Sequence, residues 1–74
     1  MAYIAQFLNN SETAIRFFSI EFSKDYFSLA YSNNLYVLDY SDVVDISETD
    51  EFFKMETKKN NFTFDIINQK FTIQ

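Results

Sequence analysis

The chain has 74 residues, a formal net charge of −5, and no cysteine, histidine, glycine or proline. The lack of cysteine and histidine excludes disulfides and nearly all zinc and haem sites, and the negative charge argues against binding nucleic acid or anionic lipid through a basic face. At this length we expect one small domain, residues 1–74, whose thin core depends on its ten Phe and five Tyr.

The first residues of the chain carry no basic cluster and no long apolar run, so we expect no signal peptide. Nowhere do about 18 apolar residues follow one another, so no membrane span is predicted. Together with the lack of cysteine, these features predict a cytoplasmic protein, located in the cytosol of the cell that hosts it.

Residues 11–23, SETAIRFFSIEFS, fit two kinds of element. Every second residue from Phe18 to Phe22 is apolar, as in a strand, whereas Ile15, Phe18 and Phe22 also share one face of a helix. Ser11 could begin that helix as its N-cap. Aromatic and β-branched residues favour the strand, and a short helix here is the alternative.

Apolar and polar residues alternate along most of the chain after this segment, which is typical of strands with one buried face. We therefore expect a mainly β protein, or an α+β protein if residues 11–23 are helical. About six short strands would form an antiparallel meander, folded as a twisted sheet or a partly open barrel. After residues 11–23, the predicted strands are 26–31, 35–40, 43–47, 53–57, 62–66 and 70–74.

Asparagine pairs separate several of these segments, in a chain that has neither glycine nor proline to make turns. Asparagine tolerates positive φ better than most residues, because its amide can bond to neighbouring backbone. We therefore predict turns at Asn9-Asn10, Asn33-Asn34 and Asn60-Asn61.

Residues 38–51, LDYSDVVDISETDE, contain six carboxylates and no cation. If residues 43–47 are a strand, the carboxylate in its middle faces solvent and the others lie at the two corners beside it. Such a surface would attract a groove lined by Lys and Arg, or it would only keep an edge strand soluble. The candidate partner-binding carboxylates are Asp39, Asp42, Asp45, Glu48, Asp50 and Glu51.

Aromatic side chains outnumber the positions that a thin core offers. Phe17 and Phe18 cannot both face inward on a strand, and the same holds for the pair formed by Phe52 and Phe53. Exposed aromatic residues are typical anchors of protein–protein contacts, including those of a homodimer. We expect Tyr36, Tyr40 and Phe52 to be apolar anchors beside the carboxylates.

No motif in the sequence indicates catalysis. A nucleophilic Ser or Thr would have no His as its base, and neither the spacing of a calcium loop nor a glycine-rich phosphate loop is present. We therefore expect no enzyme, no cofactor and no metal ion.

By size and charge the chain resembles the anti-CRISPR and other anti-defence proteins of phages and mobile elements. The resemblance implies a non-enzymatic inhibitor whose acidic surface engages a basic, nucleic-acid-handling host protein such as a defence nuclease. Two alternatives stay open. One is a structural protein that self-assembles through its C-terminal strands, and the other is a module that sequesters a small nucleotide near Arg16 or the lysines.

Overall fold

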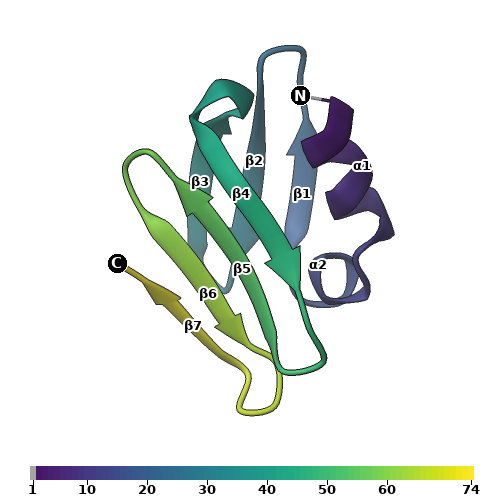
Figure 1. Cartoon of the computed structure of the whole chain (residues 1–74), viewed down its shortest axis with the longest axis vertical. Helices are drawn as coiled ribbons and strands as arrows, with labels where there is room; N and C mark the ends of the chain where they lie inside the picture. Colours follow the sequence, from purple (N-terminus) through teal and green to yellow (C-terminus); the bar gives the residue numbers. More distant parts are fainter. Residues whose placement is uncertain (1) are drawn as a thin grey trace. The chain divides into compact units, whose positions relative to one another are not determined.

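The computed structural model describes residues 2–74 (Figure 1). The contacts within it divide the chain into two compact units. The first unit ends at Ser41 and the second runs from Asp42 to Gln74. The prediction of a mainly β protein is confirmed, with seven strands in two antiparallel sheets of three and four strands. That the chain forms a single domain stays a prediction.

The first unit contains two helices and a sheet of strand order β1-β2-β3, and the second contains a sheet of order β4-β5-β6-β7. The short 3-10 helix η1 joins β3 to β4, so consecutive strands change sheet there. Residues 2–74 therefore form two antiparallel sheets and no closed barrel. The elements are α1 (Ala2–Asn10), α2 (Glu12–Phe17), β1 (Ser19–Phe22), β2 (Tyr26–Tyr31), β3 (Asn34–Asp39), η1 (Tyr40–Asp42), β4 (Val43–Glu48), β5 (Phe52–Thr57), β6 (Asn61–Asp65) and β7 (Lys70–Ile73).

Residues 11–23 contain both of the elements that the sequence allowed. The backbone N–H of Ala14 donates to Ser11 Oγ at 3.0 Å, so Ser11 is the N-cap of α2. The helix stops before Phe18, whose extended backbone leads into β1. The preference for strand was therefore wrong over Glu12–Phe17 and correct over Ser19–Phe22.

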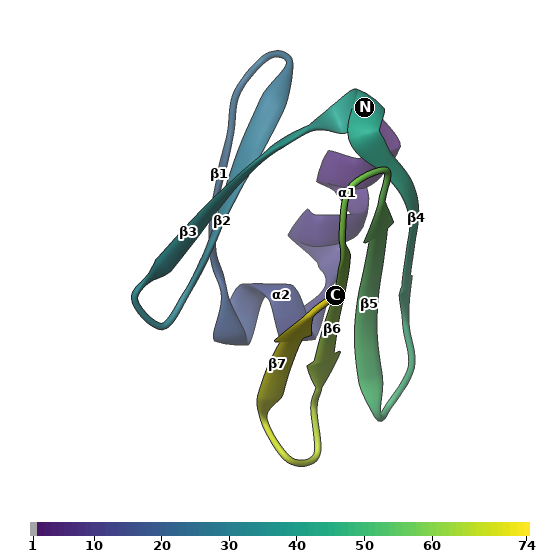
Figure 2. The same ribbon diagram turned by 90° about the vertical axis from the view of Figure 1, so that its left-hand side faces the viewer.

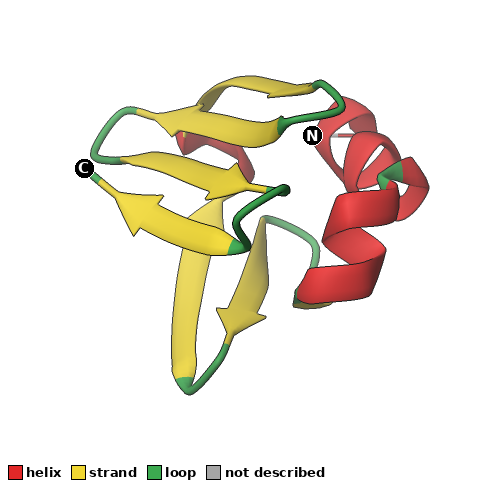
Figure 3. Cartoon of the chain, turned by 90° about the horizontal axis from the view of Figure 1, so that it is seen from below, coloured by secondary structure: helices red, strands yellow, loops and turns green. Residues whose placement is uncertain are grey.

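Helix α1 was not predicted, and it replaces the turn expected at Asn9-Asn10. Ile4 and Leu8, four residues apart on one helix face, are both buried. Asn10 is the last residue of the helix, where its side-chain amide donates to the backbone oxygen of Gln6 at 2.9 Å. Both α-helices, red in Figure 3, precede the first strand.

The first sheet buries the face that lies toward the two helices, which are on the same side of it in Figure 2. Phe27 and Leu29 of β2 and Leu38 of β3 are buried there. Tyr40 follows β3 and packs its ring against Phe27, with ring centroids 5.2 Å apart. The alternate residues of the same strands form the opposite face, which is turned to solvent.

The second sheet also has one buried face, which carries Phe53 and Met55 of β5 and Phe62 and Phe64 of β6. These positions confirm the predicted alternation. Strand β4 departs from it, because a β-bulge between Val43 and Asp45 shifts the register. The extra residue, Val44, is 58% exposed instead of sharing the buried face with Ile46.

Side chains of Thr and Asp hold the hairpin turns of the second unit. Thr49 Oγ1 accepts from two backbone N–H groups between β4 and β5, and Thr57 Oγ1 does the same between β5 and β6. Between β6 and β7, Asp65 accepts from the backbone and the side chain of Asn68 at 3.0 and 2.8 Å. These bonds lower the pKa of the Asp65 carboxyl, because they favour its charged form.

The Asn pairs lie at two of the three predicted turns, but they do not supply the positive φ angles. Asn33 belongs to the two-residue loop between β2 and β3, and Asn60 precedes β6. Positive φ occurs instead at Ser32 (58°) and at Gln69 (53°). Among residues 2–74, no helix has the length and apolar composition needed to cross a membrane.

Candidate functional site

Three of the predicted site residues lie in the first unit, on or after β3. Asp39 is exposed, whereas Tyr36 is half-buried on the same side of the strand as Leu38. Tyr40 is only 7% exposed, so little of its side chain is accessible in this structure, and its role as an anchor stays a prediction. Burial raises the pKa of the Tyr40 hydroxyl, because the phenolate would lose hydration.

The other predicted carboxylates belong to the second unit and are spread along β4 and the turn that follows it. Asp42 is half-buried at the end of η1, just before the strand, and Glu48 is half-buried at the end of the strand. Asp50 and Glu51 are exposed in the turn that Thr49 holds. Only Asp45 lies on the solvent face in the middle of a strand, so the acidic run is divided among several places.

The strand register places Asp45 in a row of polar side chains across the second sheet. Asp45 lies opposite Glu56 on β5, and Glu56 lies opposite Asn61 on β6. Asn61 exchanges two backbone hydrogen bonds with Gln74, of 2.9 and 3.0 Å, so Gln74 continues the row. We call these four residues the acceptor row. Each carries at least one side-chain oxygen that accepts hydrogen bonds.

The acceptor row borders an open depression of about 240 Å³ in the surface of the second unit. The next row toward the β4–β5 turn supplies Ser47, Lys54 and Thr63, which follow one another across three strands. The depression is lined by Asp45, Ser47, Lys54, Met55, Glu56, Asn61, Phe62, Thr63 and Gln74.

Charge in the depression is concentrated at one end. Asp45 and Glu56 are like charges directly opposite each other on two paired strands, an arrangement that destabilises a sheet. The Lys54 ammonium lies over the Phe52 ring, 5.1 Å from its centroid. Since Phe52 and Glu56 are on opposite sides of Lys54 along β5, this contact turns the ammonium away from the acceptor row. Phe52 thus contacts Lys54, and its role as an apolar anchor stays a prediction.

Sequence reasoning found Asp45 but missed the other members of the acceptor row. Glu56 and Asn61 flank the β5–β6 turn, so a hairpin register drawn from the alternation would have paired them. Gln74 joins them only through the β6–β7 register. Asp45 meets Glu56 only because of the bulge at Val44, which the alternation of the sequence does not reveal.

The chemistry available to this site is recognition of hydrogen-bond donors. Two carboxylates and two carboxamides offer oxygens, which suit the guanidinium of Arg or the ammonium of Lys. Within residues 2–74, no group of three or more Asp or Glu side chains is arranged to hold a metal ion. Comparisons with protein-family models, curated proteins and solved structures find no match to this chain.

Proposed function

We propose that this protein is a non-enzymatic binding protein whose acceptor row engages Lys and Arg side chains on a basic partner protein. The direct opposition of Asp45 and Glu56 beside the depression is the observation that carries the proposal. A cation placed between the two carboxylates relieves their repulsion and adds charge-assisted hydrogen bonds. Asn61 and Gln74 supply further oxygens for a donor-rich side chain.

The partner in this proposal is a nucleic-acid-handling host protein, and the chain acts as its stoichiometric inhibitor, in the manner of phage or mobile-element anti-defence proteins. A groove that binds nucleic acid is lined by Lys and Arg, and the two neighbouring carboxylates of the acceptor row offer it negative charge in place of phosphates. The small size and the net charge of −5 support rapid, electrostatically steered association with such a groove.

The nucleotide-sequestering alternative has less support. Asp45 and Glu56 repel a phosphate group, and the one cation of the depression, Lys54, is held over Phe52. Arg16, the other suggested centre, lies over the ring of its neighbour Phe17 at 5.3 Å.

Self-assembly has a specific observation in its favour and remains the second candidate. Strand β7 is the outermost strand of its sheet, and its residue Ile73 is 38% exposed. An outer strand can pair with the same strand of another copy. This candidate predicts association that depends on protein concentration and is little affected by salt.

The test compares two variants that remove equal charge from the second unit. Asp45→Asn/Glu56→Gln neutralises the acceptor row, and Asp50→Asn/Glu51→Gln neutralises the exposed turn. In a pull-down from host lysate with mass spectrometry, we expect wild type and the turn variant to retain one basic protein that the acceptor-row variant loses. Equal retention by both variants would overturn the proposal.

A further inference from the structure

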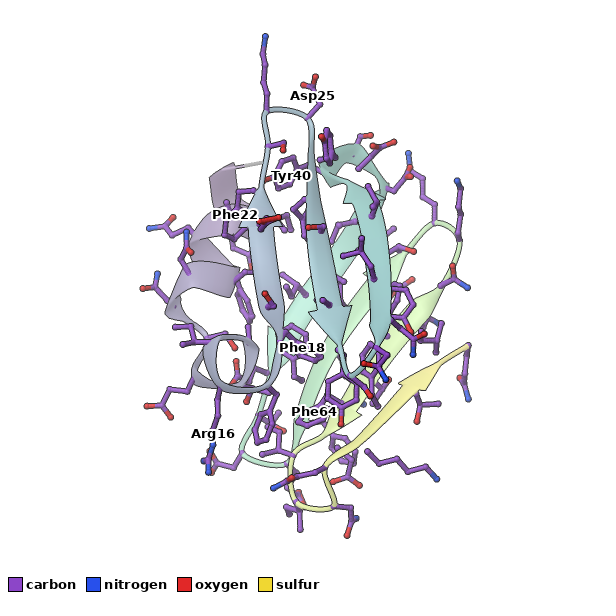
Figure 4. All side chains as sticks on the ribbon, turned by 180° about the vertical axis from the view of Figure 1, so that it is seen from behind. Arg16, Phe18, Phe22, Asp25, Tyr40 and Phe64 are labelled. Carbon is purple, nitrogen blue, oxygen red and sulfur yellow. The ribbon has the colours of Figure 1, made fainter. Side chains whose placement is uncertain are left out.

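The first unit carries an exposed apolar surface that the acceptor row does not explain. Leu35 and Val37 of β3 are 66% and 64% exposed, and Tyr26 at the start of β2 is 45% exposed. They lie on the face of the first sheet opposite to the helices, which Figure 4 views directly. Exposed apolar side chains that gather on one face are typical of a binding surface.

The register shows how these side chains are arranged on the sheet. Leu35 lies opposite Ala30 and Val37 opposite Ser28, so two large side chains on β3 stand beside two small ones on β2. Tyr26 closes one end. We call these five residues the outer apolar face. Because Ser28 and Ala30 are small, a partner's side chains can approach the backbone of β2 closely and pack against Leu35 and Val37 on one side.

Two charged residues of the first sheet lie beside this face, and both are acidic. Glu21 lies opposite Ser28 on β1, and Asp39 lies opposite Tyr26 on β3. The two cations of the first unit are elsewhere, since Arg16 is in α2 and Lys24 is in the β1–β2 turn. Two copies packed through this face would bring carboxylates together without a cation, and an anionic lipid surface would be repelled as well.

We propose that the outer apolar face binds an amphipathic, basic helix of a partner protein. The helix lays Leu- or Ile-like side chains over Ser28 and Ala30 against Leu35 and Val37, while its flanking Lys or Arg side chains reach Glu21 and Asp39. A helix suits the face of a sheet, because an added strand would bind at an edge through its backbone. The proposal goes beyond the acceptor row, since it concerns the other unit and a chiefly apolar contact.

The experiment uses three synthetic helical peptides of about 18 residues. The first has a leucine stripe flanked by lysines, the second has glutamate in place of the lysines, and the third has serine in place of the leucines. In NMR titrations of the ¹⁵N-labelled full chain, we expect only the first peptide to bind the outer apolar face and to shift the amides of Ser28, Ala30, Leu35 and Val37.

Variants then test the contact directly. Leu35→Gln/Val37→Thr should weaken binding of the first peptide about tenfold or more. The matched control, Val44→Thr/Ile67→Gln, changes two apolar residues of the second unit that are also exposed, and should bind as wild type does. Asp45→Asn/Glu56→Gln should bind it unchanged too, which separates this surface from the acceptor row.

Several outcomes would overturn the proposal. One is that the serine-containing peptide binds as tightly as the first peptide, and another is that Leu35→Gln/Val37→Thr binds the first peptide as wild type does. A third is that wild type self-associates or binds anionic vesicles and that Leu35→Gln/Val37→Thr does not. If the variant does not fold, as judged by circular dichroism, the wild-type titration decides. Amide shifts confined to the acceptor row would then contradict the proposal.

Discussion

Asp45 and Glu56 place two negative charges opposite each other on neighbouring strands, and this has a cost in the free protein. We predict that Glu56→Gln raises the free energy of unfolding by about 0.2–1 kcal/mol, because it removes the repulsion and keeps the side chain's size. Urea denaturation measures the change. Glu51→Gln, in the exposed turn, is the control and should alter stability less. A loss of stability on Glu56→Gln would show that the carboxylate is already satisfied within the fold.

The buried Tyr40 makes stability sensitive to alkaline pH. Burial raises the pKa of its hydroxyl above the ordinary value of 10.0. The native state therefore retains the proton where the unfolded state has lost it. The contribution of the Tyr40 hydroxyl to the free energy of unfolding is therefore fully present below pH 10. It is lost as the pH rises toward the raised pKa.

We predict that Tyr40→Phe removes this part of the alkaline sensitivity. The free energy of unfolding, measured between about pH 9 and pH 11, should fall less steeply for the variant than for wild type. Tyr26→Phe, which changes an exposed hydroxyl, is the control. Equal slopes for wild type and Tyr40→Phe would contradict the assignment.

At the scale of elements, the β5–β6 hairpin shows how a chain without glycine or proline makes a tight turn. Thr57 Oγ1 donates to the backbone oxygen of Asn60 at 2.7 Å and accepts from the N–H groups of Lys59 and Asn60. Because Thr57 is buried, water would not replace all of these hydrogen bonds if the hydroxyl were removed.

We predict that Thr57→Val lowers the free energy of unfolding by about 1–3 kcal/mol, since it removes the hydroxyl but preserves the branched shape. Thermal or urea unfolding measures the loss. Thr72→Val on the exposed side of β7 is the matched control and should change stability little. Similar effects of the two substitutions would show that the hydroxyl of Thr57 does not organise the turn.

The alternation of apolar residues predicted strands well where pairing is regular, as in β2, β5 and β6. It failed for α1, whose first turn has no acidic residue and whose last turn has no basic one. Nor does alternation specify which strands pair, so the change of sheet at η1 was not foreseen. For the same reason the acidic run was predicted as one surface, whereas the bulge at Val44 pairs Asp45 with Glu56 from another segment.

At the scale of the whole molecule, the two units offer surfaces of different chemistry. The second unit presents oxygen acceptors around a depression, and the first presents an apolar face bordered by Glu21 and Asp39. In both proposals the partner carries Lys or Arg, which hydrogen-bond to the acceptor row in one unit and reach Glu21 and Asp39 beside the apolar contact in the other. The net charge of −5 favours the same partner through long-range attraction.

The most direct test of the central claim measures affinity for the retained partner at about 50 mM and 300 mM salt. The proteins compared are wild type, Asp45→Asn/Glu56→Gln and Asp50→Asn/Glu51→Gln. The proposed role of the acceptor row predicts that wild type and the turn variant bind tightly and lose affinity at high salt. It also predicts that the acceptor-row variant binds weakly at both concentrations while remaining at least as stable as wild type. Wild-type affinity for the acceptor-row variant would contradict it.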